Sequence, residues 1–284
     1  MLVSGPPLLF LLVLFAAPGI IMLLASIRYP GEFGGLAPLT SSDASTLHGL
    51  TLETYKFFFS DFIYTQVFIK SIAMAFFTTL FCLILAYPLA LLIARSPKKR
   101  RDMMVLLVIL PFASNFLIRV YAWMIVLGPQ SALNVAFNAM LHWFSIAPVH
   151  LLFSPFAVLI AMVYAHLPFM VLPLYTNLAR HDQALLDAAQ DLGASAWQRF
   201  WRVTFPLSLP GVYSGSALVF IPALGMFVIP EILGGTGDML IGNLIKEQFL
   251  ITRDWPFGST LAILLTLSVM LIAWLSGRMG RRYA

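Results

Sequence analysis

The sequence has few charged residues and a single cysteine, and each shortage excludes certain classes of protein or site. Only 10% of its 284 residues are charged, against roughly a quarter in an ordinary soluble domain. With 60% hydrophobic residues and a mean hydropathy of +0.90, no soluble core can hide the apolar surface, so we expect the lipid bilayer to be the solvent. The single cysteine, Cys82, excludes disulfides and cysteine-based metal sites, and we expect it to be a small packed residue.

The sequence also lacks the short motifs that mark nucleotide binding and hydrolysis. No G-x-x-x-x-G-K-[ST] occurs, so we expect no P-loop and no ATP bound by this chain. Neither a nucleophile elbow nor H-E-x-x-H is present. The five histidines have no metal-ligand spacing, and His166 is expected to be a hydrogen-bonded packing residue. We therefore expect no enzyme site, no cofactor and no metal in this chain.

Long apolar stretches are what the sequence does contain. A helix needs about 20 apolar residues to cross the bilayer, and six stretches are long enough. The first resembles a signal peptide in position, but it has no basic residues before it and is long for a signal sequence. We expect an all-α membrane protein, one domain over 1–284 with six spans at 7–27, 67–94, 103–127, 154–178, 207–233 and 256–278.

Lysine and arginine are shared unequally between the two sets of connections. Eleven lie within 95–101, 180–202 and 278–282, whereas the other set holds only Arg28, Lys56, Lys246 and Arg253. The positive-inside rule therefore predicts that both termini are cytoplasmic. This topology explains the pI near 9.5 better than nucleic-acid binding does. In the outer connection 128–153, residues 131–144 are expected to form a short helix in the membrane interface.

One cytoplasmic connection, residues 180–211, differs from the others because it is long and has the pattern of two short helices. Asp182 is expected to cap the first helix, over 183–192. Gly193 suits the left-handed conformation that ends many helices. The apolar residues of the first helix recur at helical spacing and form one stripe; they are Leu185, Ala188, Ala189 and Leu192.

Ser195 and Gln198 have the spacing of a capping box for the second helix, which Pro206 is expected to close. The connection is too short to cover the apolar stripe of the first helix. An exposed stripe of this kind fits a groove on another protein. The alternative is a helix that lies flat on the lipid surface.

Within this segment, Asp187-Ala188-Ala189 is followed after three residues by Gly193 and, nine residues later, by Val203-Thr204-Phe205-Pro206. This spacing resembles the EAA loop of ABC-importer permeases, in which Glu-Ala-Ala, Gly and Ile-x-Leu-Pro stand at the same intervals. Asp, Val and Phe here replace the family's Glu, Ile and Leu. The resemblance implies that the loop, about 179–206, docks into a cleft on an ATPase subunit. Its coupling residues would be Leu185, Asp187, Ala188, Ala189, Leu192, Gly193, Val203 and Pro206.

The resemblance extends along most of the chain. Residues 95–128, 164–175 and 240–259 are similar to the first permease of spermidine/putrescine importers. Branches that carry ferric iron, opines or phosphonates share the loop and remain alternatives. The resemblance implies a type I importer fold in the bacterial cytoplasmic membrane and an alternating-access mechanism. It also implies a second permease, two ATPase copies that bind ATP and Mg²⁺, and an external polyamine-binding protein.

A secondary transporter is the alternative from another class. It would explain six spans and charged residues within them. It gives no reason for the spacing in residues 180–211, so we favour the importer permease.

Charged side chains inside a membrane are costly, so Arg119 and Glu231 are functional candidates. Arg119 lies 16 residues into the third span, about 24 Å along a straight helix, where snorkelling to the outer interface is the alternative role. Glu231 lies at the outer end of the fifth span, where a solvated loop carboxylate is the alternative. We expect the fifth span to line a path because it is broken by Pro210, Gly215, Pro222, Gly225 and Pro230.

A path for an extended polycation needs acceptor oxygens and aromatic faces. Ser114 and Asn115 supply acceptors, and Glu231 supplies negative charge. Ordinary packing or an interfacial aromatic belt is the alternative role of the rings. The sequence also suggests that Arg119 and Glu231 pair across the path in the resting state. The candidate rings are Tyr121, Trp123 and Tyr164.

Overall fold

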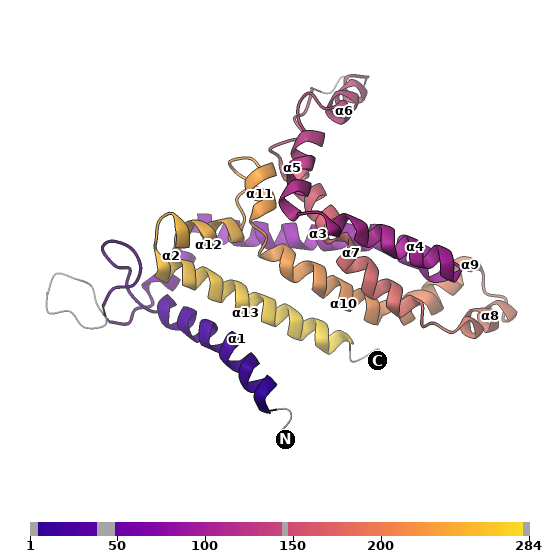
Figure 1. Ribbon diagram of the computed structural model, residues 1–284, viewed down its shortest axis with the longest axis horizontal. Coiled ribbons are helices and arrows are strands. Elements are labelled where there is room, and N and C mark those ends of the chain that lie inside the picture. The colour runs from indigo at the N-terminus through magenta and orange to yellow at the C-terminus, as the bar shows by residue number, and fades with distance from the viewer. Residues whose placement is uncertain (1–4, 39–48, 144–146, 281–284) are drawn as a thin grey trace. The chain divides into compact units, whose positions relative to one another are not determined.

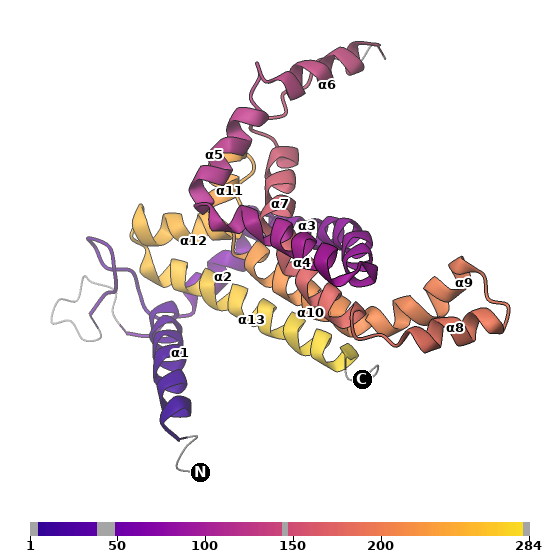
Figure 2. The ribbon, with the colours of Figure 1, turned by 45° about the vertical axis from the view of Figure 1, so that its right-hand side comes forward.

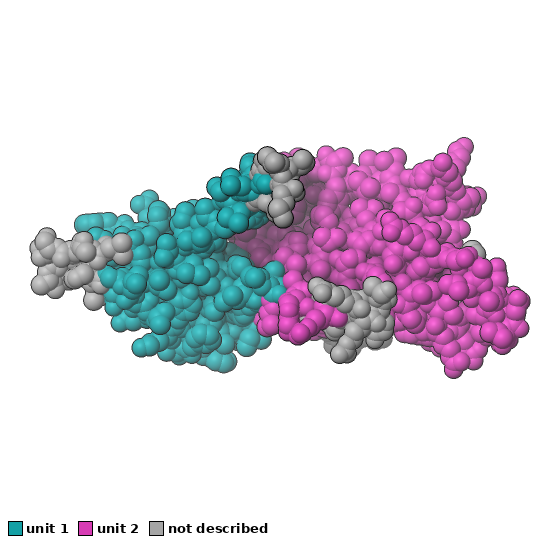
Figure 3. All heavy atoms as spheres, turned by 90° about the horizontal axis from the view of Figure 1, so that it is seen from below, with its two compact units in different colours: residues 1–70, 240–270 teal, residues 71–239, 271–284 magenta. Residues whose placement is uncertain are grey.

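The computed structural model describes residues 5–38, 49–143 and 147–280. These residues form helices joined by short connections, and the only extended pairings among them are two isolated bridges, Arg28–Leu50 and Pro30–Leu36. The chain divides into two compact units, coloured separately in Figure 3. Unit 1 comprises residues 1–70 and 240–270, and unit 2 comprises residues 71–239 and 271–284. That the chain is one membrane domain stays a prediction.

Five helices are long and apolar enough to cross a membrane, within the part of the chain that the structure describes. They lie where five of the six spans are predicted (Figure 1), and Cys82 is fully buried within the second of them, as expected. The helices that contain these spans are α1 (Gly5–Ser26), α3 (Phe62–Arg95), α7 (Pro155–Leu178), α10 (Phe205–Leu224) and α13 (Trp255–Gly280).

The predicted third span, 103–127, is not one straight helix. The chain forms α4 (Lys98–Ile109) and a 3₁₀ turn, η1 (Leu110–Ala113), before α5 (Phe116–Val126), and the two halves are bent by 91°. Pro111 lies in the 3₁₀ turn, where it ends the first helix, and the side chain of Asn115 caps α5, where the second helix begins. The depth of 24 Å expected for Arg119 assumed a straight helix and is therefore wrong.

The predicted fifth span is broken only near its end. Helix α10 runs through Pro210, Gly215 and Pro222 and stops at Leu224, which shows that the backbone tolerates both prolines, as membrane helices can. Gly225 follows its last residue, and α11 (Val228–Leu233) begins after three residues outside any helix. The expectation that all five prolines and glycines break this span is wrong, since only the region of Gly225 does so.

Three shorter helices lie in the connections that are predicted to be on the outside. Helix α6 (Ala132–Trp143) confirms a helix in 131–144, of which residue 144 falls outside the described part. Helices α2 (Glu53–Ser60) and α12 (Ile241–Leu250) were not predicted, because their residues carry no long apolar run. Ser41 and the terminal basic residues Arg281 and Arg282, which enter the topology argument, also lie outside the described residues.

The core of unit 2 is built from α3, α7 and α10. Buried apolar residues of the three helices form one cluster, and α7 packs along α10 (Figure 2). The two helices approach closely at Gly211 and Gly215. A Cβ on Gly211 would lie 2.8 Å from Asn177 Cβ, and one on Gly215 would lie 2.7 Å from Met170 Sδ. Small residues four apart allow membrane helices to pack this tightly.

The core of unit 1 joins helices from opposite ends of the sequence. Phe58 of α2, Leu244 of α12 and Leu261 of α13 are buried in one apolar cluster. Beside it, Thr260 Oγ1 donates a hydrogen bond to Ser26 O at 3.3 Å and is 2.9 Å from Thr54 Oγ1. These bonds satisfy buried hydroxyls and fix the end of α1 against α2 and α13.

Candidate functional site

The segment 180–211, which is predicted to be cytoplasmic, contains two short capped helices, as expected. In α8 (Gln183–Asp191) the side chain of Asp182 accepts a hydrogen bond from Ala184 N at 3.0 Å. In α9 (Ala196–Arg199) the backbone N–H of Gln198 donates to Ser195 Oγ at 3.3 Å, and the backbone N–H of Ser195 donates to Gln198 Oε1 at 2.9 Å. Both caps satisfy N–H groups that a helix cannot satisfy itself.

Gly193 sets the angle between the two helices. It has a φ of +80°, which is the left-handed conformation expected at this position. The backbone N–H of Gly193 donates to Gln190 O at 2.8 Å, and that of Ala194 donates to Ala189 O at 3.0 Å. Arg199 then reaches back to Gln190, with Nη1 2.5 Å from Oε1. α8 and α9 consequently lie side by side at the end of α10 (Figure 2).

Large apolar side chains of this segment point into solvent. Leu192 is 88% exposed, Trp197 is 70% exposed and Leu185 is 50% exposed. Asp187 and Ala188 are exposed as well, whereas Ala189 is half-buried. The apolar stripe predicted on the first helix is therefore open along most of its length, and α9 adds an exposed apolar side chain of its own at Trp197.

The second helix does not end at Pro206, and that prediction is wrong. After α9 the chain passes through one π turn, η2 (Phe200–Thr204), and continues directly into α10. Pro206 lies in the first turn of α10, where a missing backbone N–H is tolerated. The result is one helical stretch from Ala196 to Leu224, 29 residues long, from the coupling segment into the predicted membrane span.

A polar pocket lies behind α8 and α9. It encloses about 270 Å³ between the two helices, the π turn and the C-terminal end of α3. Four apolar residues form part of its wall: Leu91, Leu186, Ala196 and Phe200. The rest of the wall is polar and consists of Arg95, Asp187, Arg199 and Thr204. The sequence analysis assigned no such role to Arg95 or Thr204, because neither position carries a local signal for a pocket.

The candidate path residues of unit 2 gather around the bend between α4 and α5. The Arg119 guanidinium carbon lies 4.6 Å from the centre of the Phe112 ring and 5.7 Å from that of Phe116. Arg119 Nε and Nη1 are buried and have no hydrogen-bond partner among the described residues. Arg119 makes no ion pair in the described part of the chain, so the expected pairing with Glu231 is not found. Cation–π contacts take its place.

The other path candidates have local roles of their own. Asn115 Oδ1 accepts a hydrogen bond from Leu117 N at 2.8 Å and so caps α5. Ser114 Oγ donates to Pro111 O at 2.7 Å within the bend. Trp123 and Tyr164 are in edge contact, with ring centres 5.5 Å apart. Tyr121 is half exposed, and Glu231 is exposed in the first turn of α11.

The remaining candidate, His166, is a packing residue as predicted. It is 2% exposed, and its Nδ1 lies 2.8 Å from Met162 O. A metal site is not formed by any group of three ligand residues among those described.

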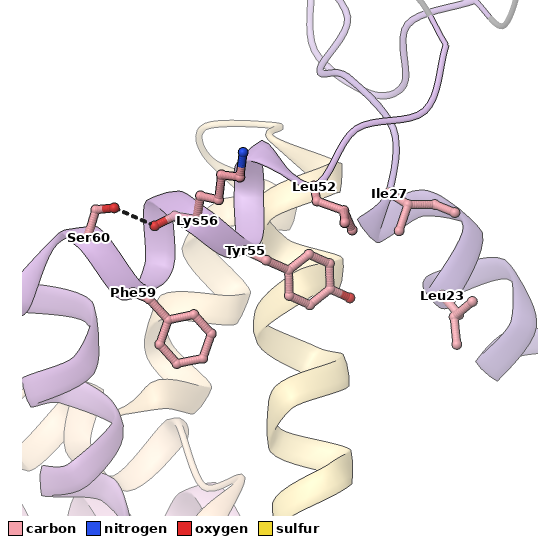
Figure 4. A pocket seen from close by; sticks show the side chains of 7 residues that line it. All are labelled: Leu23, Ile27, Leu52, Tyr55, Lys56, Phe59 and Ser60. Carbon is pink, nitrogen blue, oxygen red and sulfur yellow. Dashed lines mark hydrogen bonds between the residues drawn. The ribbon is translucent and has the colours of Figure 1, made fainter.

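In unit 1 an open groove of about 770 Å³ lies between the C-terminal end of α1 and α2 (Figure 4). The rings of Tyr55 and Phe59 point toward it, whereas the ammonium group of Lys56 points away from them. Leu23 of α1 and Ile27, which follows the helix, form the opposite wall. The groove is mainly apolar and contains none of the path candidates.

A family model described as the binding-protein-dependent transport system inner membrane component matches residues 86–283, which include the whole coupling segment. The chain belongs to this family. It is therefore a permease subunit of an ABC importer and an inner membrane protein. This family assignment confirms the resemblance read from the spacing of Asp187 to Pro206.

Named relatives of this permease cover most of its length. The spermidine/putrescine transport system permease protein PotB of Escherichia coli (strain K12) is 42% identical over 251 residues, 86% of this chain and 90% of the relative. PotB of Haemophilus influenzae is 41% identical over 232 residues, 82% of this chain and 80% of the relative. The inner membrane ABC transporter permease protein YdcU of E. coli is 28% identical over 241 residues, 81% and 76% of the two chains.

Solved structures share the fold of this permease at low sequence identity. A bacterial ABC transporter involved in the import of alginate matches with a TM-score of 0.74 and 17% identity, over 99% of this chain and 94% of the other. The MetNI methionine ABC transporter in an inward-facing conformation matches with a TM-score of 0.57 and 19% identity, over 78% of this chain and 96% of the other. The all-helical importer fold predicted from the sequence is thus confirmed.

Proposed function

We propose that this permease forms, with a second homologous permease, the path for spermidine and putrescine uptake. The proposed substrate rests on the 41–42% identity to permeases named for spermidine/putrescine transport, over more than four fifths of the chain. The exposed ring of Tyr121 and the exposed side chain of Glu231 suit an extended polycation. An external polyamine-binding protein would make the first selection, and alternating access would carry the substrate across.

The coupling segment is the proposed docking site for the ATPase. Its helices are fixed by two caps and a left-handed glycine, so they present the exposed Leu185, Leu192 and Trp197 in a defined arrangement. Exposed apolar anchors on a short helix fit a groove on a partner protein. The sequence contains no P-loop, so ATP and Mg²⁺ would bind to two copies of the ATPase and this chain would need no cofactor.

The substrate is tested by uptake in cells that lack their own polyamine importers. The chain is expressed with its second permease, ATPase and binding protein, and entry of labelled spermidine and putrescine is measured. Saturable, ATP-dependent uptake is expected. Uptake of ferric iron, an opine or a phosphonate instead of a polyamine would contradict the proposed substrate while leaving the importer assignment intact.

Docking of the ATPase is tested at Leu192, whose side chain is almost fully exposed and so contributes little to the fold. Leu192→Ser is expected to lower the amount of ATPase that co-purifies with the permease, because it removes an apolar anchor. Trp143→Ser is the matched control, since Trp143 is 87% exposed on α6, away from the coupling segment. Equal ATPase recovery in both variants would favour a helix that lies on the lipid surface.

The predicted topology is tested by labelling single cysteines that are introduced into the chain, which has only one cysteine of its own. Cys82 is fully buried, so the natural chain should give almost no signal with an impermeant thiol reagent. A cysteine at Lys99 should be shielded in intact cells and should react after the membrane is opened. A cysteine at Ser41 should react in intact cells. The opposite labelling pattern would overturn cytoplasmic termini.

A further inference from the structure

The polar pocket behind α8 and α9 has charged and polar walls, which neither the packing of these helices nor the proposed docking of the ATPase requires. Exposed Leu192 does not line it, and its wall includes Arg95, the last residue of α3. Its volume of about 270 Å³ has room for a small ion with its waters, since one water takes about 30 Å³. The pocket is therefore a candidate binding site in its own right.

An unsatisfied buried hydroxyl lies in the wall of this pocket. Thr204 is 4% exposed, and its Oγ1 has no hydrogen-bond partner among the described residues. A threonine in a regular helix usually bonds to the carbonyl four residues earlier, but Thr204 closes the π turn, where this spacing is altered. Burying a hydroxyl without a partner is destabilising, so an incoming acceptor would recover a bond that the chain itself does not make.

The charged residues of the pocket favour an anion. Arg95 and Arg199 carry two positive charges, and Asp187 carries one negative charge, which leaves a net charge of +1. No ion pair joins these three side chains in the described structure. Arg199 uses Nη1 for Gln190, whereas a guanidinium has five N–H donors and so keeps several for a ligand. Guanidinium groups bind phosphate and carboxylate oxygens in paired geometry.

We infer that this pocket binds a phosphate-type oxyanion between Arg95, Arg199 and the Thr204 hydroxyl. The bound anion would join the end of α3 to the coupling helices, because Arg95 belongs to α3 and Arg199 to α9. The phosphate can be free in the cytoplasm or belong to the headgroup of an anionic lipid, since α3 is a predicted membrane span. The inference does not depend on which substrate is transported.

The primary test is calorimetric titration of inorganic phosphate into the full-length chain in detergent, at constant ionic strength. Binding to the natural chain is expected, and Arg95→Gln or Arg199→Gln should weaken it about tenfold or more, since each removes a charge-assisted contact. Arg202→Gln is the matched control, because Arg202 lies in the π turn directly after α9 but does not line the pocket. Equal loss in all three variants, or no binding to the natural chain, would overturn the inference.

Thr204→Val gives a second test that does not rest on charge. Valine has nearly the shape of threonine without the hydroxyl, so the variant should be more thermally stable than the natural chain in phosphate-free buffer. At saturating phosphate this advantage should vanish, because the natural hydroxyl is then satisfied. An advantage of the same size with and without phosphate would show that nothing binds to the hydroxyl and would overturn its part in the site.

The source of the phosphate is distinguished in vesicles. The chain is reconstituted in phosphatidylcholine alone or in phosphatidylcholine with phosphatidylglycerol, and phosphate is titrated into each. Equal binding in both supports a free anion, and loss of binding only with phosphatidylglycerol supports a lipid headgroup. Binding of phosphate in neither kind of vesicle would overturn the inference.

Discussion

Gly193→Val is expected to lower transport roughly tenfold or more while the chain still inserts in the membrane. Gly193 has a φ of +80°, and a β-branched residue in this conformation costs on the order of 1–3 kcal/mol. Relief of that strain would turn α8 away from α9 and displace the exposed Leu185 and Leu192 together. Uptake, ATPase recovery and the amount of permease in the membrane are measured side by side.

A matched variant separates backbone strain from the size of the new side chain. Nothing lies within 4 Å of a Cβ built on Gly193, so any side chain has room there. Asparagine tolerates the left-handed conformation, and Gly193→Asn should therefore transport nearly as well as the natural chain. If both variants transport equally, the conformation of Gly193 is not needed for coupling.

Gly211→Val is expected to have the largest effect on stability. Its Cβ would lie 2.8 Å from Asn177 Cβ and 3.2 Å from the Pro173 carbonyl oxygen, and neither atom can move away without the backbone of α7. Overpacking of this kind costs about 1–3 kcal/mol or more. A lower temperature of thermal unfolding and less permease in the membrane are expected.

The same substitution at two other glycines gives an intermediate case and a control. A Cβ on Gly215 would meet Met170 Sδ, a flexible atom that can move, so Gly215→Val should be milder than Gly211→Val. Gly19→Val on α1 is the control, because its Cβ would have nothing within 4 Å. Similar losses for Gly211 and Gly19 would show that the close approach of α7 and α10 does not limit stability.

The parts of the coupling segment that the sequence predicts are those set by neighbouring residues. The cap at Asp182, the capping box at Ser195 and Gln198, and the conformation of Gly193 all depend on contacts within four residues, and the structure confirms each. The end assigned to the second helix at Pro206 is wrong, because a π turn realigns the chain before the proline. Phe200 of the π turn packs on Tyr87 of α3, a contact between residues far apart in the sequence that no local pattern reports.

The path region could be predicted only in part for the same reason. Trp123 and Tyr164 were chosen for their chemistry, and they do meet across α5 and α7. The bend of 91° was missed, since residues 103–127 read as one continuous apolar run. With the bend in place, Arg119 finds Phe112 on the other side of it, so an argument from depth along a straight helix assigned it the wrong neighbours.

Because the helix from Ala196 to Leu224 is unbroken, the number of residues between two positions fixes the angle between their side chains around the helix axis. Each residue of a helix turns the chain by about 100°, so deletion of a single residue within Phe200–Thr204 would turn Trp197 about a quarter of a circle relative to Gly211 and Gly215. The apolar face offered to a partner and the face packed on α7 would then no longer match. A loop in this place would absorb such a change, whereas this helix fixes the register between the two faces residue by residue.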